Sequence, residues 1–386
     1  MTSPSESNRL SKGLARQWLE ALVAIPSPSG EEADIACYCE DLLSQWDFEV
    51  SRQPLADGRF NILAKKGKGP ALLLYAHMDT VPPDPAYTHD PFQVRYTEDR
   101  ALGLGVSDMK SGLAVILEAA RTAHPEGYTL KIALGVDEEA FSQGAWQLVS
   151  SQWLSDVALA LVPELVIDSN VEQLGLGRAG FMAFQLVTHG PRQHGAVPLE
   201  TPSAIERALE AVAHLKAFPL RPYPLQDLSE RLIVHGIQAR VQGLTHPSRC
   251  EVDFAIFLSP ERSAEQVHEQ LKQHFAHIPH VELQPAPRPT PVANAYTVSA
   301  SHPLVKFVQD QYASLKGKPL PVAHGWSVAD ENVLQSVISG PVLSLAPVGG
   351  YSHRVGEWLD LKSFTTVVSL YKNILTQAGT YLEALQ

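Results

Sequence analysis

The spacing of apolar residues changes regularly along the first 178 positions, and these changes predict helices and strands in turn. Apolar residues three or four positions apart indicate helices, whereas short continuous apolar runs indicate buried strands. We expect helices at 14–25, 31–47, 111–124 and 142–153, and strands at 60–66, 71–79, 129–139 and 157–164. Because the strands alternate with helices, this part of the chain should form an α/β domain.

A second pattern begins after Gly177, where the strands become half-polar and the order of elements changes. The expected order is strand, helix, strand, strand, helix, strand, at 181–190, 201–218, 231–241, 248–258, 263–277 and 281–286. This βαββαβ order is typical of a ferredoxin-like α+β unit. Thr201 and Ser263 are the expected N-caps of its two helices.

A Pro-rich link, PAPRPTPVANA, leads back to α/β material with helices at 302–315 and 361–385 and a strand at 340–348. The chain should therefore contain one α/β catalytic domain, made of residues 1–178 and 293–386. A ferredoxin-like domain of residues 179–292 is inserted into it.

The composition is that of a globular protein, since 45% of the 386 residues are hydrophobic and 19% are charged. The formal net charge of −12 disfavours binding to nucleic acid or to an anionic membrane. No stretch reaches the ~20 apolar residues of a membrane span, and the polar N-terminus lacks the apolar run of a signal peptide.

Three cysteines, Cys37, Cys39 and Cys250, are few enough to suggest reduced thiols, so we expect a cytoplasmic protein. Cys37 and Cys39 are two positions apart in a predicted helix. They should point in different directions there, which argues against a metal-binding pair.

The sequence LYAHMDTVP places His77 and Asp79 two residues apart at the end of a predicted strand. Alternate residues of a strand share a face, so these side chains can pair. A metal-bound imidazole usually donates its second N–H to a carboxylate in this way. Alternatively, the pair only stabilises the end of the strand.

Further acids and one histidine follow the ends of other predicted strands or lie in loops near them. They are Asp108, Asp137, Glu138, Glu139, Glu164 and His353. Strand ends at one edge of an α/β sheet commonly build sites, and so many acids at one edge would repel each other. A pair of divalent cations would reverse that repulsion. Oxygen and imidazole donors without cysteine favour Zn²⁺, with Co²⁺ or Mn²⁺ as alternatives.

Taken together, the stretches LVAIPSPSGEE, AHMDTVP, GLGVSDMKSGLAV, GVDEEAFSQGA and SHRVGEW resemble a known family. It is the acetylornithine deacetylase, succinyl-diaminopimelate desuccinylase, aminoacylase and glutamate carboxypeptidase family of di-zinc hydrolases. The resemblance covers nearly the whole chain, including the inserted domain. It implies a mixed sheet like that of zinc peptidases, and a lid domain that forms a homodimer.

The resemblance also implies a set of ligands for two metal ions. Asp108 would bridge both ions, His77 and Glu164 would complete one site, and Glu139 and His353 would complete the other. The peptide bond after Asp108 is expected to be cis.

The remaining roles implied by the resemblance are catalytic. Asp79 would orient His77, and Glu138 would be the general base that takes a proton from water and passes it to the leaving nitrogen. His194 of the lid would donate to the developing oxyanion across the dimer interface. Alternatively, His194 is only a histidine of a surface loop, since the nearby His189 could be the residue that matches. Asp330 resembles a residue near the substrate, or it caps a helix.

The chain departs from the resemblance where the family often holds the α-carboxylate of its substrate with an Asn and an Arg. The Asn position is taken by Thr245 or His246, and the Arg position by Ala255. Arg178, Arg240 or Arg249 could replace the missing arginine, which is otherwise the natural carboxylate clamp.

The expected function is metal-dependent hydrolysis of an amide bond in a small N-acyl amino acid or a related compound. Glu164 lies in VPEL, and a Glu at this position favours deacylases within the family. A dipeptidase or carboxypeptidase is the first alternative, and a binding protein on the same scaffold is the second. The expected ligands and the expected base are all present, which argues against the binding protein.

Overall fold

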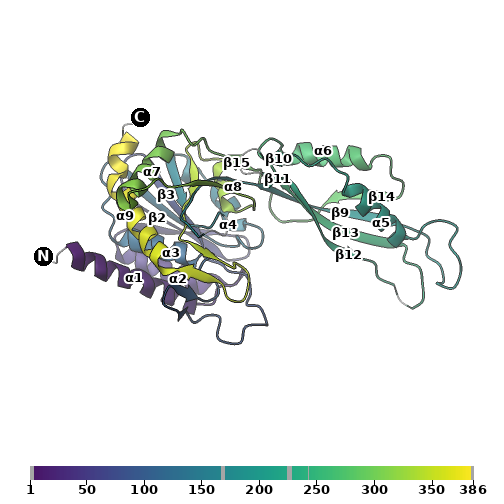
Figure 1. Cartoon of the computed structure of the whole chain (residues 1–386), viewed down its shortest axis with the longest axis horizontal. Coiled ribbons are helices and arrows are strands. Elements are labelled where there is room, and N and C mark those ends of the chain that lie inside the picture. The colour runs from purple at the N-terminus through teal and green to yellow at the C-terminus, as the bar shows by residue number, and fades with distance from the viewer. Residues whose placement is uncertain (1–3, 167–169, 224–227, 242, 384–386) are drawn as a thin grey trace. The chain divides into compact units, whose positions relative to one another are not determined.

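The computed structural model describes residues 4–166, 170–223, 228–241 and 243–383 of the chain (Figure 1). The described chain forms two compact units. The larger unit comprises residues up to 178, 297–325 and 329 onward, and the smaller comprises 179–296 and 326–328. The last two residues of the expected C-terminal helix, 384–385, lie outside the described residues.

A mixed sheet forms the centre of the larger unit. Its strands follow the order β1-β2-β6-β3-β7-β17-β8-β15, and β16 pairs with β8. Strands β6, β3, β7 and β17 are parallel neighbours. Strand β2 is antiparallel to both of its neighbours, β1 and β6. The strands are β1 Glu49–Pro54, β2 Phe60–Gly67, β3 Ala71–His77, β6 Thr129–Gly135, β7 Val157–Val162, β8 Leu174–Arg178, β15 Tyr296–Thr297, β16 Val322–Gly325 and β17 Val342–Ser344. Every residue of β3 is buried, as expected for a parallel strand covered on both faces.

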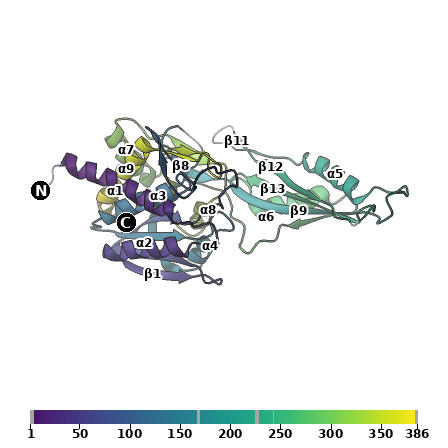
Figure 2. The ribbon, with the colours of Figure 1, turned by 90° about the horizontal axis from the view of Figure 1, so that it is seen from below.

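Helices α1, α3 and α9 pack against one another in the larger unit, and α7 packs against α9 (Figures 1 and 2). The helix α3 is buried along nearly its whole length because it also contacts β3. The helices of this unit are α1 Pro4–Ala24, α2 Ala33–Gln45, α3 Lys110–Arg121, α4 Gln143–Val149, α7 Pro303–Lys316, α8 Asp330–Gln335 and α9 Leu361–Glu383, with a short 3₁₀ turn at Gln152–Leu154.

A small antiparallel sheet in the larger unit joins two segments that are far apart in the chain. Its order is β18-β19-β5-β4, so the strands near residue 355 pair with those near residue 100. The strands are β4 Arg95–Tyr96, β5 Arg100–Leu102, β18 Gly349–Gly350 and β19 Trp358–Asp360. The loop that contains His353 connects β18 to β19.

The smaller unit has the expected βαββαβ order and an antiparallel sheet of order β12-β13-β9-β14. Its helices α5 and α6 share one apolar core with the sheet (Figure 1). The elements are β9 Gly180–His189, α5 Ala204–Leu215, β12 Arg231–Gln238, β13 Arg249–Leu258, α6 Ala264–Phe275 and β14 Val281–Pro285, with a short hairpin of β10 Pro222–Tyr223 and β11 Leu228–Ser229.

One of the two predicted N-caps in the smaller unit is wrong. Helix α5 is capped by Ser203, not Thr201, because Ser203 and Glu206 form a reciprocal capping box. The prediction for α6 is confirmed, since Ser263 caps it and pairs with Gln266 in the same way.

Among the described residues, we find no helix whose length and apolar character would let it cross a membrane.

Candidate metal centre

Three parallel strands bring the predicted site residues to one edge of the sheet. Strand β3 lies between β6 and β7, and His77 is paired with the last residue of β6. His77 therefore ends β3, Glu138 and Glu139 follow β6, and Glu164 follows β7. The carboxyl ends of parallel strands are the usual place for a site in such a sheet.

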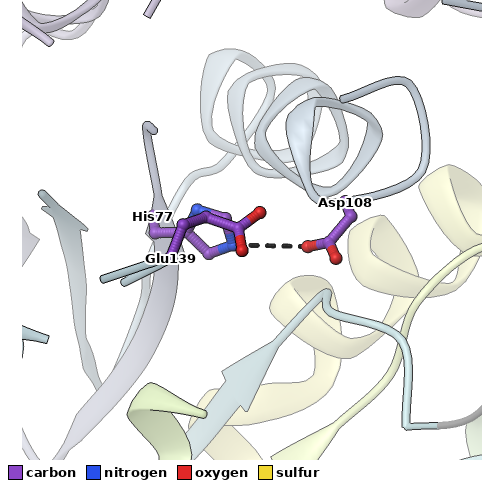
Figure 3. Close-up of side chains that lie close together, drawn as sticks. All are labelled: His77, Asp108 and Glu139. Carbon is purple, nitrogen blue, oxygen red and sulfur yellow. Dashed lines mark ion pairs between the residues drawn. The ribbon is translucent and has the colours of Figure 1, made fainter. Parts of the chain in front are cut away.

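His77, Asp108 and Glu139 form a cluster that could hold a metal ion. One ligand atom from each lies within 4.8 Å of the other two, and Figure 3 shows the three side chains pointing toward one another. His77 Nε2 is 3.5 Å from Asp108 Oδ1. Asp108 comes from the turn before α3, and its peptide bond to Met109 is cis as expected.

His353 completes the cluster from the loop between β18 and β19. Its Nε2 lies 2.8 Å from Glu139 Oε2 and 3.3 Å from Asp108 Oδ2. Asp108 thus presents one oxygen to His77 and the other to His353. This is the arrangement expected of a carboxylate that bridges two ions.

Glu164 stands apart from that cluster and forms an ion pair with a buried arginine. Arg178 Nη2 donates to Glu164 Oε1 at 3.0 Å and to Glu331 Oε1 at 2.8 Å. Burial raises the pKa of Glu164 well above its usual value, and the charge of Glu331 raises it further. Only one oxygen of Glu164 is used in this pair, so the other remains available to a ligand.

Asp79 connects three of the site residues through its carboxylate and its backbone. Its carboxylate lies 3.5 Å from His77 Nδ1 and accepts hydrogen bonds from the backbone N–H groups of Glu138 and Glu139, both at 3.1 Å. The backbone oxygen of Asp79 is 3.0 Å from the same imidazole nitrogen. Asp79 therefore holds the ring of His77 and the two glutamates in one arrangement.

The turn that carries Glu138 and Glu139 is fixed from the other side by Asp137. Asp137 adopts a left-handed conformation with φ of 72°, and its backbone oxygen accepts from the N–H of Ser142 at 2.7 Å. Arg59 donates to the Asp137 carboxylate at 2.9 Å and to Glu32 at 3.0 Å. Such backbone strain is concentrated at functional sites.

Three buried side-chain atoms of the site that could bind a metal ion have no hydrogen-bond partner in the described part of the chain. They are His77 Nε2, Glu139 Oε1 and Glu164 Oε2. An unsatisfied buried polar atom costs about 1–3 kcal/mol, so three at one sheet edge point to a missing partner. Divalent metal ions fit, because imidazole nitrogen and carboxylate oxygen are the donors they take in proteins.

The electrostatics of the cluster also call for positive charge. Burial opposes ionisation of Asp108, but the two imidazoles lower its pKa below the usual value. Conversely, Asp108 and Glu139 raise the pKa of His353 to about 10. Burial lowers the pKa of His77, yet Asp108 and Asp79 raise it well above normal. A divalent cation would supply the charge that these protons otherwise bring.

Glu138 lies beside the cluster without forming part of it. Its Oε2 is 4.0 Å from His77 Nε2, and its side chain is only 12% exposed. Burial raises its pKa well above the usual value, and the facing charge of Glu164 adds to this effect. A carboxylate with a raised pKa is suited to take up and release a proton near neutral pH.

The structure excludes two of the alternatives that the sequence left open for nearby residues. Asp330 does not cap α8, because Ala329 is the N-cap; instead the Asp330 carboxylate accepts a hydrogen bond from the hydroxyl of Tyr75. Arg178 is not free to clamp a substrate carboxylate, since it is 1% exposed and paired with two glutamates.

The network of Arg178 and Glu331 was not predicted from the sequence. The available signal was an arginine at the end of the apolar stretch LGLGR, together with a second acid directly after Asp330. A buried arginine requires acidic partners, and these two positions supply the charge and one of its partners.

His194 belongs to the smaller unit, where it lies exposed in the loop after β9. Its Nδ1 accepts from the N–H of Ala196 at 3.2 Å, so a neutral ring carries its proton on Nε2 and can donate it. His189 Nε2 lies 3.3 Å from Glu282, so that nitrogen already has an acidic partner.

Comparison with known proteins identifies the family. Peptidase family M20/M25/M40 matches residues 73–377. The succinyl-diaminopimelate desuccinylase of Wolinella succinogenes is 26% identical over 322 residues, covering 81% of this chain and 85% of the relative. The acetylornithine deacetylase of Pectobacterium carotovorum is 33% identical over 210 residues, covering 50% of this chain and 53% of the relative.

The fold also has a counterpart among solved structures. A dinuclear metal-binding peptidase of the M20 family from Bacillus subtilis superimposes with a TM-score of 0.67 at 15% identity, covering 96% of this chain and 99% of that chain. The family match spans most of the sequence and includes every candidate ligand of the sheet edge. This chain therefore belongs to peptidase family M20/M25/M40 and is a hydrolase of C–N bonds.

Proposed function

We propose that this protein uses two divalent metal ions to hydrolyse the amide bond of a small N-acyl amino acid or a related compound. The observation that carries the proposal is the placement of Asp108, whose two oxygens face two different imidazoles. The orphaned donors of the same sheet edge support it.

The ligands divide into two sets around Asp108. His77 and Glu164 would hold one ion with an oxygen of Asp108, and Glu139 and His353 would hold the other. The short distances from His353 to Glu139 and to Asp108 support the second set. The free oxygen of Glu164 supports the first. Zn²⁺ suits this donor set, and Co²⁺ or Mn²⁺ would also be accepted.

The bound ions would lower the pKa of a bound water to about 7 and polarise the substrate carbonyl. Glu138 would take a proton from the attacking water and deliver it to the leaving nitrogen. Its position beside His77 and its raised pKa suit both transfers. General acid–base catalysis of this kind typically contributes ~10²–10⁴-fold. Asp79 would keep His77 in the tautomer that binds through Nε2.

The smaller unit would contribute a donor to the reaction and the contact between subunits. We propose that it forms a homodimer, in which His194 donates from Nε2 to the oxygen that gains charge in the transition state. The tautomer set by the Ala196 N–H supports this role.

The residues around the site restrict how the substrate is recognised. Ala255, at the position where relatives would have an arginine, is buried in β13 between Ala183 and Ile233. A hollow beside Glu164 is lined mainly by apolar side chains at 165–166, 171 and 346–348.

A dipeptidase or carboxypeptidase is the alternative, because the same ligands and base would cleave a peptide bond. The similarity to a desuccinylase and a deacetylase supports N-acyl substrates for this chain. The similarity to a peptidase from Bacillus subtilis supports the alternative.

A substrate panel on metal-reconstituted protein tests the proposal. The protein is stripped with a chelator and reloaded with Zn²⁺ or Co²⁺, and released amine is measured for acetyl, succinyl and longer apolar acyl amino acids and for dipeptides. We expect metal-dependent release from acyl amino acids. Release from dipeptides alone would favour the alternative, and no release from any compound would contradict amide hydrolysis.

A further inference from the structure

A fully buried glutamate lies behind the candidate metal centre without reaching it. Glu357 is 1% exposed and lies in the loop between β18 and β19, four residues after His353. Its Oε1 accepts from the backbone N–H groups of Ser107 at 2.7 Å and Asp108 at 3.0 Å. Its Oε2 accepts from the N–H of Gly105 at 2.9 Å.

Those three hydrogen bonds hold one short turn of backbone. The turn is 105–108, and it ends in the residue that faces both imidazoles. The nearby Lys110 interacts with Glu357 electrostatically, but its Nζ donates to the backbone oxygen of Ile25 at 2.8 Å. The burial of Glu357 therefore depends on backbone N–H donors, which are strong partners for a carboxylate. An apolar side chain in this space would leave the three backbone N–H groups without an acceptor, so the glutamate ties the turn to the loop of His353.

The same loop is joined to the 101–108 segment by further contacts. Trp358 and Leu359 pair with Leu102 and Ala101 across β19 and β5, and the N–H of Gly103 donates to the backbone oxygen of Glu357 at 3.4 Å. At Gly349 a Cβ atom would lie 2.1 Å from Ser107 Oγ, so the two segments approach too closely for a side chain. Glu357 is the hydrogen-bonding centre of this junction.

We propose that Glu357 is a positioning residue of the metal centre. By holding the 105–108 turn against the loop of His353, it fixes the two oxygens of Asp108 relative to both imidazoles. Supporting groups behind metal ligands typically change metal affinity 10–100-fold when they are removed. The inference rests on the proposed dinuclear site.

Two substitutions test this role, and a third serves as a control. Glu357→Gln keeps the size and one acceptor oxygen but turns an NH₂ group toward one of the backbone N–H donors. Glu357→Ala removes all three bonds. The control is Glu118→Gln, since Glu118 is equally buried in the same unit but its carboxylate pairs with Arg121 and Lys372.

The measurements are the affinity for Co²⁺ by competition with a chromophoric chelator, the visible spectrum of the Co²⁺ protein, and the Tm of the metal-free form. We expect Glu357→Gln to weaken Co²⁺ binding about tenfold and Glu357→Ala up to about 100-fold, with altered absorption bands. Glu118→Gln should lower Tm while leaving affinity and spectrum as in the wild type.

Wild-type affinity and spectrum in folded Glu357 variants would overturn the inference, even if their Tm were lowered. Failure of both variants to fold would assign Glu357 to the core and would overturn it equally. If the wild-type protein itself bound no Co²⁺, the dinuclear site and with it the proposed function would fail. This outcome is recognised without any of the variants.

Discussion

Among the described residues, each unit contains one fully buried arginine paired with acid, Arg178 or Arg262. The two differ in whether the oxygens of their acidic partners are all hydrogen-bonded. Arg262 of the smaller unit is 3% exposed and pairs with Glu230. Both oxygens of Glu230 are used, because Ser259 and the backbone N–H of Arg221 donate to them as well. Both charged groups of this buried pair therefore have their hydrogen-bond partners within the protein.

Arg178 of the larger unit is as deeply buried, but its two acidic partners are not fully hydrogen-bonded. It donates to one oxygen of Glu164 and one of Glu331, and the second oxygen of each has no hydrogen-bond partner within the described part of the chain. The comparison teaches that burial of charge does not mark a site. What distinguishes the pair in the larger unit is that both of its glutamates keep an acceptor oxygen without a partner among the described residues.

Histidines show that an unpartnered atom must also lie among other ligand atoms. Nine of the 15 lie in the smaller unit, and two of these, His214 and His274, stack with ring centroids 4.1 Å apart. Each ring has its Nε2 within 2.9 Å of the backbone oxygen of the other residue. His77 Nε2 has no hydrogen-bond partner among the described residues, but the same holds for His189 Nε2 and His268 Nε2 of the smaller unit. What distinguishes His77 is that Asp108 and Glu139 place further ligand atoms within 4.8 Å of its own.

The largest effect should come from Glu138, the proposed general base, which lies beside the candidate metal centre but is not one of its proposed ligands. Glu138→Gln should reduce kcat by ~10²–10⁴-fold because proton transfer is lost. Metal content should stay near that of the wild type. The measurement is released amine together with bound metal by elemental analysis. In the smaller unit, Glu251→Gln removes only an exposed pair with Arg249 and should leave kcat unchanged.

Normal turnover in Glu138→Gln would contradict the assignment of the base. Lost turnover accompanied by lost metal would instead move Glu138 into the ligand set.

The two buried arginines offer the most direct test of the comparison. Arg178→Met and Arg262→Met should each destabilise the protein by about 3–5 kcal/mol, because each leaves buried carboxylates without their partner. Only Arg178→Met should also change metal affinity, since it releases Glu164. Denaturant unfolding of the metal-free proteins and chelator competition separate the two effects. Equal metal affinity in both variants would remove the distinction between the arginines.

His194 tests whether the smaller unit takes part in catalysis. Removal of one donor to an oxyanion typically costs 10²–10³-fold in kcat, so His194→Gln should lower kcat by about that factor with unchanged bound metal. His189→Gln is the matched control, since His189 pairs with Glu282, and steady-state kinetics of both variants give the comparison. A larger loss in the His189 variant would transfer the role to His189.

The smallest effect concerns Asp79. Asp79→Asn places an NH₂ group where the carboxylate accepts from Glu138, Glu139 and Ser29. We expect metal affinity to fall about 10–100-fold, as is typical when a partner behind a ligand is lost. Calorimetric titration of the stripped protein with Zn²⁺ measures this directly. Unchanged affinity would reduce Asp79 to a stabiliser of the strand end.

Most of the fold could be predicted because it depends on local patterns, whereas the candidate ligands and their roles were implied by the family resemblance of the motifs that contain them. Buried strands such as ALLLYAH end in polar residues, and the order of strands and helices indicates where those ends meet. The N-cap of α5 was also within reach, because Ser203 has Glu206 three positions later, whereas Thr201 is followed at that distance by Ala204.

Other parts of the site depend on contacts that no local pattern contains. Glu357 is a single acid in a loop, and its partners at 105–108 lie about 250 residues earlier in the chain. Asp330 could be placed near the site but not against Tyr75, since that pairing requires α8 to be docked beside β3. Long-range positioning of this kind becomes visible only in the folded structure.

The central claim is that Asp108 holds two ions between two imidazoles. It is tested most directly by counting the ions bound per chain when chelator-stripped protein is titrated with Co²⁺, in the wild type and in Asp108→Asn. We expect two ions in the wild type, with Asp108→Asn losing at least one and losing the spectrum of the paired site. A single ion in the wild type, or two ions in both proteins, would contradict the bridging role of Asp108.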